Sequence, residues 1–113
     1  MRVYVPATLT ALAGFVDAGQ VRAGERLVAS EESEEAEYAA LAAAADAAAD
    51  LLDAPGRRIV VVADVPDPDA AFPLSLVAAV HADTEVIDPR ATDLPELGWY
   101  APQEVPDLLA SAP

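Results

Sequence analysis

The sequence predicts a small α/β domain, and three observations support that class. Residues 57–64 place two arginines before an uninterrupted apolar, largely β-branched run that ends at an aspartate. Such a run, apolar on both faces, is typical of a central strand covered on both sides. Helical and strand patterns alternate around it, and 113 residues suffice for one core. We therefore expect a single α/β domain over 1–113, with a mostly parallel or mixed four-stranded sheet, two main helices and a short C-terminal helix.

The chain begins with a strand and a helix. Residues 2–5 favour a β-strand. Apolar residues then recur at helical spacing over 9–18, after Thr8, which is a suitable N-cap. Gly19 stands where a helix commonly ends in a left-handed residue. The pattern predicts a first helix over 9–18.

A second strand and a longer helix follow. Residues 25–29 predict a short strand, and Ser30 is placed to cap the next segment. Five glutamates crowd the first turns, where the helix dipole favours anions. Apolar residues then repeat every three or four positions, mostly as alanine. We expect a helix over 31–53 that lies close to the sheet but buries little area per residue.

The apolar pattern of the central strand predicts that its side chains are buried on both faces of the sheet. Because side chains alternate along a strand, Val60 and Val62 should face one side of the sheet. Ile59 and Val61 should face the other side, and all four should be buried. This strand locates the core of the domain.

The second half of the chain is less regular. Residues 66–69 alternate proline and aspartate and predict a rigid loop. Residues 76–82 predict a fourth strand without a preceding helix, which would run antiparallel at an edge of a mixed sheet. After residues 97–100 a short helix is expected, with Pro106 in its first turn. A ferredoxin-like α+β fold is the alternative, ranked second because a helix stands where that fold needs a hairpin.

Charge and composition limit the function. The chain has 20 acidic and 6 basic residues, a net charge of −14, and no cysteine. Disulfides and thiolate metal sites are therefore excluded, and an acidic surface repels nucleic acids and anionic lipids. We find no signal peptide or membrane span and expect a cytoplasmic protein. Solubility is the favoured interpretation of the charge; docking of a basic protein partner is the alternative.

The only histidine is the first catalytic candidate. His81 lies on the predicted strand 76–82, where it alternates with Val77 and Ala79. Asp83 comes two residues later, so the two side chains could act as a general base and the group that orients it. A histidine at the rim of the sheet, bonded to the backbone, is the favoured alternative.

Three aspartates form the second candidate site. Asp64, Asp67 and Asp69 follow the central strand, at the edge where parallel sheets gather ligands. Three carboxylates could hold Mg²⁺ or Ca²⁺ and, with His81, support a metal-assisted hydrolase. The loop has no glycine for a sharp calcium-binding turn, and a solvated acidic loop is the favoured interpretation.

Three arginines stand at the starts of predicted strands. Arg2, Arg57 and Arg58 could form a basic spot for an anion at one edge of the sheet. Charged flanks paired with nearby glutamates are the plainer interpretation.

Aromatic residues are the candidates for contact with a partner. Trp99 and Tyr100 adjoin each other near the C-terminus, and Tyr38 lies on the alanine-rich helix. The pair could anchor the tail on the core, which is the favoured role, or form a hot spot for a partner. The alanine-rich helix could also pack closely in a homodimer.

Five sequence blocks together resemble a known family. The blocks are residues 1–9, 34–40, 57–61, 77–81 and 99–109. The chain resembles a family of small acidic actinobacterial proteins classed as a domain of unknown function. The resemblance implies an actinobacterial cytoplasmic protein, and it transfers no catalytic residue and no cofactor. We therefore expect a small acidic binding or adaptor protein without a cofactor; a metal-assisted hydrolase is the alternative.

Overall fold

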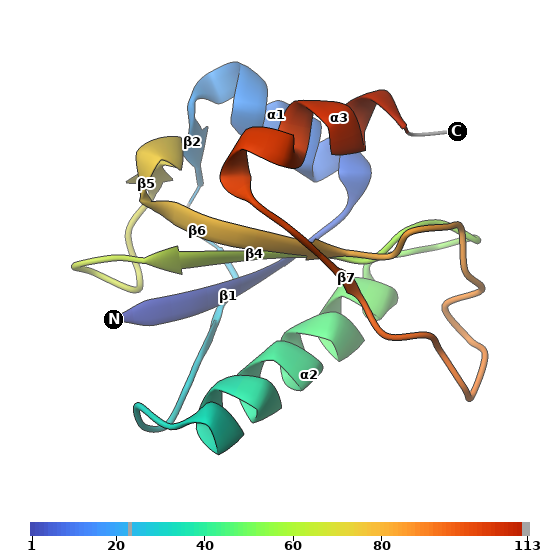
Figure 1. The fold of residues 1–113 in the computed structure, drawn as a ribbon, viewed down its shortest axis with the longest axis horizontal. Coiled ribbons are helices and arrows are strands. Elements are labelled where there is room, and N and C mark those ends of the chain that lie inside the picture. The colour runs from blue at the N-terminus through green and yellow to red at the C-terminus, as the bar shows by residue number, and fades with distance from the viewer. Residues whose placement is uncertain (23, 112–113) are drawn as a thin grey trace.

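The computed structural model describes residues 1–22 and 24–111 of the chain (Figure 1). Its elements, in chain order, are β1 (Arg2–Ala7), α1 (Leu9–Ala18), β2 (Gln20–Val21), β3 (Leu27–Val28), α2 (Glu34–Asp50), β4 (Ile59–Asp64), β5 (Phe72–Pro73), η1 (Leu74–Leu76), β6 (Val77–Ala82), β7 (Gly98–Tyr100), η2 (Pro102–Glu104) and α3 (Val105–Ala110). The elements η1 and η2 are single 3-10 turns.

The main sheet has five strands in the order β3-β1-β4-β6-β7, and each neighbouring pair is antiparallel. The prediction of a mostly parallel or mixed four-stranded sheet is therefore wrong. The crossover through α2 joins β3 to β4, which run in the same direction, but β1 lies between them. A β-α-β pattern in the sequence indicates that its two strands run in the same direction. It does not show whether they are neighbours in the sheet, so it cannot reveal a strand inserted between them.

The helices cover opposite faces of this sheet. Figure 1 shows α1 and α3 on one face and α2 alone on the other. An α+β fold of the ferredoxin type packs its helices on a single face. The ferredoxin-like alternative is therefore wrong as well, although the sheet is antiparallel.

The face under α1 and α3 carries the larger core. Ile59, Val61 and Ala63 of the central strand β4 are at most 1% exposed and face this side. They pack with Leu12 of α1 and Leu108 of α3. The two-stranded sheet of β2 and β5 closes one end of this layer.

The face under α2 carries a smaller core. Val60 and Val62 of β4 pack with Tyr4 of β1 against Ala40 and Ala44 of α2. The predicted division of residues 59–62 between the two faces, and their burial, are confirmed. An alanine stripe lets the helix backbone lie close to the sheet, but it covers only a narrow band.

The capping residues of α1 are those that the sequence predicts, whereas the N-cap of α2 is a different serine. Thr8 Oγ1 accepts the amide N–H of Ala11 at 3.1 Å, and Gly19 takes the left-handed conformation with φ 72°. The predicted helix over 9–18 is confirmed. In α2 the cap is Ser33, not Ser30, so the helix begins three residues later than predicted.

The strand β7 was not predicted as a strand. It pairs antiparallel with β6, and Trp99 lies opposite His81. The ladder between β4 and β6 shifts its register between Val62 and Ala63. His81 and Ala79 pair with Val60 and Val62 on the α2 face, whereas the bulge turns Val77 to the opposite face. None of the helices in the described residues is long and apolar enough to cross a membrane.

Candidate functional site

An open trough runs between α2 and the strand pair β6–β7. Two adjoining hollows of about 280 and 440 Å³ share four lining residues, Tyr38, Leu41, His81 and Trp99. We call this surface, defined by those four residues, the aromatic trough. It gathers the histidine and two of the aromatic residues, which are far apart in the sequence.

The helix supplies one wall of the trough. Tyr38, Leu41, Ala42 and Ala45 line it and recur at the i, i+3, i+4 and i+7 positions of one helical stripe. This stripe lies beside the buried alanines, at the edge of the surface where the helix contacts the sheet. The helix therefore presents one ring and one leucine to solvent along its edge.

The sheet supplies the floor and the other wall. Cross-strand register places Trp99 opposite His81, and His81 opposite Val60. The helix α2 packs mainly on β1, β3 and β4, which leaves the same face of β6 and β7 open. The trough therefore exists because the helix is narrow and the sheet extends beyond it.

The rings of the trough are accessible. Tyr38 is 67% exposed and Trp99 is 61% exposed, which is unusual for large rings of a small chain. His81 is half-buried between them, and burial lowers the pKa of its imidazole from the ordinary value of 6.5. At neutral pH the floor is consequently an uncharged ring. Three rings on an open surface suit stacking against a planar or cationic group.

Trp99 and Tyr100 have different roles, although they are adjacent. Because side chains alternate along β7, Tyr100 points to the other face and packs against the core under α1 and α3. The favoured prediction that the pair anchors the tail thus holds for Tyr100 and is wrong for Trp99. Only Trp99 is available to a partner at the trough.

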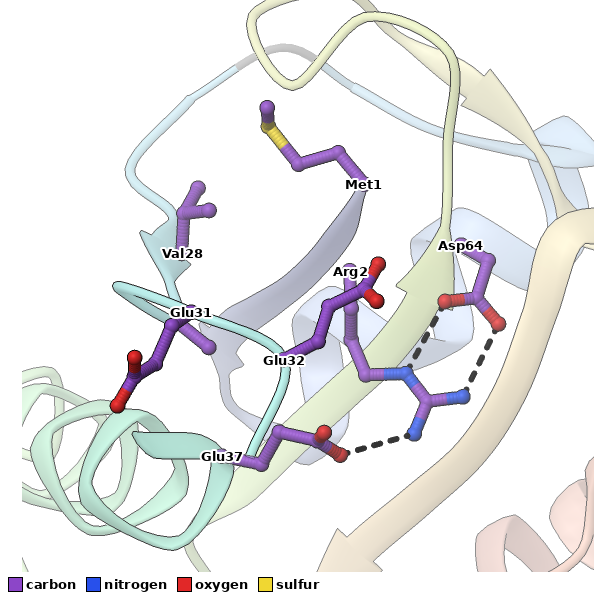
Figure 2. Close-up of a pocket in the computed structure, with 8 residues that line it drawn as sticks. Met1, Arg2, Val28, Glu31, Glu32, Glu37 and Asp64 are labelled. Atoms are coloured by element: carbon purple, nitrogen blue, oxygen red, sulfur yellow. Dashed lines mark hydrogen bonds and ion pairs between the residues drawn. The ribbon is translucent and has the colours of Figure 1, made fainter. Parts of the chain in front are cut away.

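An acidic recess adjoins the trough (Figure 2). The recess has a volume of about 630 Å³, and Arg2 and Glu37 line both the recess and the 440 Å³ hollow of the trough. Figure 2 shows the Arg2 guanidinium between the carboxylates of Asp64 and Glu37. Glu31 and Glu32 line the recess and, among the described residues, form no ion pair with Arg2. Four carboxylates outnumber the two cationic groups, the Arg2 guanidinium and the N-terminal ammonium of Met1, so the recess is negative.

The ion pairs of the recess follow from strand register. Arg2 and Asp64 stand directly opposite each other on β1 and β4. Arg2 Nε donates to Asp64 Oδ1 and Nη2 donates to Oδ2, each at 3.0 Å, and Nη1 lies 3.5 Å from Glu37 Oε1. The hydrogen bonds from Arg2 lower the pKa of the Asp64 carboxyl. Arg2 is thus already paired, and the N-terminal ammonium of Met1 donates to the Val65 carbonyl oxygen at 2.9 Å. A basic ligand would therefore meet mainly carboxylates.

The predicted basic spot is not formed. In an antiparallel sheet the start of β1 lies beside the end of β4, so Arg2 is at the opposite end from Arg57 and Arg58. Arg57 and Arg58 are both 5% exposed. Arg58 Nη2 donates to Asp83 Oδ1 at 2.7 Å, and its backbone N–H donates to Oδ2 at 2.8 Å. The pair joins the start of β4 to the segment after β6 and stabilises the sheet rather than binding an anion.

The proposed histidine–aspartate pair is not formed either. The Asp83 carboxylate is fully buried and accepts hydrogen bonds from Arg58, so it does not orient His81. Val77, expected on the same face as His81, packs on the opposite core because of the bulge. His81 is therefore a surface ring of the trough, not the base of a dyad.

The three candidate metal ligands do not converge. Asp64 is bound to Arg2, and Asp67 Oδ1 accepts the backbone N–H of Asp69 at 2.9 Å in a local turn. His81 lies opposite Val60, four residues along the strand from Asp64. Among the described residues, no group of three or more acidic or histidine side chains is placed to hold a metal ion.

Sequence reasoning missed the leucine of the trough and the role of Asp83. Leu41 looked like an ordinary core position of an amphipathic helix. Asp83 follows the strand at a place where a solvated turn is the common expectation. Arg58 before β4 and Asp83 after β6 could have indicated a cross-strand pair. That inference requires knowing that these two strands are antiparallel neighbours.

Comparison with known proteins gives a family and no activity. No curated protein and no solved structure matches the chain. One family model matches residues 1–109, and its description is a family of unknown function. The match confirms the resemblance drawn from the five sequence blocks, and the chain belongs to the family DUF6912.

Proposed function

We propose that this protein is a non-catalytic binding protein that takes a basic polypeptide segment along the aromatic trough. The observation that carries the proposal is the exposed pair of rings, Trp99 and Tyr38, on either side of an open strip of sheet. Binding energy at interfaces concentrates on such aromatic residues. We expect the protein to act in the cytoplasm of an actinobacterium, without direct contact with nucleic acid or membranes.

Charge supports a basic partner. The trough and recess hold two arginines, and both are paired with carboxylates. Glu96 at one end of the trough and the glutamates of the recess at the other add further negative charge. A net charge of −14 attracts a cationic segment over long range and repels a second copy of the same chain. The basic partner is therefore favoured over the homodimer.

The chemistry of recognition follows from the rings. A lysine or arginine of the partner can lie over the face of Trp99, which is the best aromatic acceptor for a cation–π contact. A second basic side chain can reach Glu31 and Glu32 in the recess. Such contacts need an extended segment, because the recess adjoins the trough at Arg2 and Glu37 rather than overlapping it at the rings.

The single tryptophan makes the proposal directly testable. Trp99 is the only tryptophan of the chain, so its fluorescence reports on the trough alone. Titration with a short peptide of alternating arginine and apolar residues should change the emission saturably, and added salt should weaken the binding. A peptide of the same length with glutamate in place of arginine is the control and should leave the emission unchanged.

Two outcomes would contradict the proposal. Equal responses to the basic and acidic peptides would remove the charge argument. Concentration-dependent self-association that buries Trp99 without any peptide would favour the homodimer instead, and sedimentation of the free protein detects it.

A further inference from the structure

A second hollow lies on the opposite face of the sheet, between α1 and α3. Its volume is about 190 Å³. The helices supply Leu12, Val16 and Val105, and β6 supplies Val77 and Val80. Figure 1 shows that α1 and α3 lie over the same face of the sheet. Val61 of the central strand β4 also lines the hollow. We call this hollow the aliphatic pocket.

The lining of the aliphatic pocket has one chemical character. Each side chain that lines it is leucine, valine or proline, without a polar atom. Water in this open pocket finds no polar side-chain atom to bond, so an apolar group can displace it favourably. Protein interiors are otherwise close-packed, so a gap of this size leaves dispersion contacts unmade. The pocket is therefore suited to an uncharged hydrocarbon surface and unsuited to a polar or charged ligand.

The pocket reaches from the surface to the central strand. Its floor includes Val21, Val61 and Val80, each at most 1% exposed. Val16 and Pro106 at its rim are exposed. A partner helix or strand is too large for this volume, whereas a single ring fits, since an apolar cavity of about 150 Å³ accepts benzene in another protein.

We propose that the aliphatic pocket is a binding site for a small, uncharged, largely hydrocarbon molecule, such as one with a single ring or a short branched chain. Burial of the ligand's apolar surface would drive the binding. The site lies across the sheet from the aromatic trough and does not depend on the function proposed there.

Methyl NMR with benzene as the probe tests the proposal. Benzene should shift the methyl resonances of Val16, Val77 and Val80 saturably and raise the melting temperature, because it binds the folded state alone. Imidazole, a ring of similar size with polar nitrogens, should do neither. Absence of saturable shifts, or shifts of equal size with imidazole, would overturn the proposal.

Two variants locate the effect. Val16→Phe places a ring at the mouth and should weaken benzene binding by about tenfold or more. Thr10→Phe, on an exposed position of the same helix, is the matched control and should bind as the wild type does. Unchanged affinity in Val16→Phe contradicts the assignment.

If Val16→Phe fails to fold, Val77→Ala decides the question. This change widens the pocket, so the variant should bind naphthalene at least about tenfold more tightly than the wild type does. No gain would overturn the proposal. Trp99→Ala should leave benzene binding intact, so that failure here and failure of the peptide site can be told apart.

Discussion

The two faces of the sheet are covered in opposite ways. Under α1 and α3, branched aliphatic side chains form the larger core, in which Val61 and Leu108 are each 1% exposed, and the aliphatic pocket is a gap beside it. Under α2, contact is made largely through alanines, and the sheet beyond the helix carries Trp99 and His81 at the surface. The comparison teaches that one face of a small sheet can supply most of the buried core while a strip of the other face stays exposed. We call the first the stable face and the second, which carries the proposed peptide site, the binding face. The following predictions test that division.

The largest effect is expected from a charge in the core under α1 and α3. Val61→Asp buries an unpaired carboxylate, which costs several kcal/mol or more and should unfold the domain. The matched control is Val28→Asp on the exposed edge strand β3, which should stay folded. Circular dichroism melting compares the two variants. A folded Val61→Asp protein would break the assignment of the stable face.

The buried ion pair should be the next most sensitive point. Asp83→Ala leaves the Arg58 guanidinium buried without its carboxylate and should cost about 3–5 kcal/mol in the free energy of unfolding. Asp64→Ala removes an exposed partner of Arg2 and should cost about 0–1 kcal/mol. Urea denaturation measures both values. Equal costs would show that the buried Arg58–Asp83 pair matters no more to stability than the exposed Arg2–Asp64 pair.

The alanine stripe of α2 should resist enlargement. Ala44 is fully buried against the sheet, so Ala44→Leu should push the helix away and cost about 1–3 kcal/mol. Ala43→Leu on the exposed side should change stability by less than about 0.5 kcal/mol. Thermal melting of the two variants tests whether position 44 needs a small side chain so that α2 can lie close to the sheet. A more stable Ala44→Leu protein would contradict it.

A smaller effect is expected from His81. Its pKa is lowered by burial, so near pH 6 the unfolded chain binds more protons at this site than the folded chain does. The stabilisation is therefore complete above the ordinary pKa of 6.5 and is lost as the pH falls through it. The charged groups that line the trough with His81 are Glu37, Glu96, Arg2 and Arg58.

The comparison with His81→Gln isolates this effect. The variant should lose stability less steeply than the wild type between about pH 7.5 and pH 5.5. All other ionisable groups are the same in the two proteins, so their contributions cancel in the difference between the two curves of stability against pH. A difference that is constant with pH would contradict the burial of His81.

Local structure could be predicted well from the sequence, and spatial order could not. The caps of α1 and the alternation of Val60 and Val61 depend on neighbouring residues, and both were predicted correctly. The antiparallel order depends on β1 entering between β3 and β4, which no local pattern encodes. The candidate site shares this dependence. Tyr38, His81 and Trp99 are each visible as single residues, but only the order of the strands brings them together.

The most direct test of the account compares Trp99→Ala with Tyr100→Ala, two adjacent rings on opposite faces. Thermal melting and the anisotropy of a labelled basic peptide are measured for both variants. Trp99→Ala should change the free energy of unfolding by less than about 1 kcal/mol and weaken peptide binding by about tenfold or more. Tyr100→Ala should lower stability by about 1–3 kcal/mol and keep the peptide affinity at a temperature where it is folded. If Trp99→Ala instead loses stability while peptide binding is unchanged, the division between a stable face and a binding face is wrong.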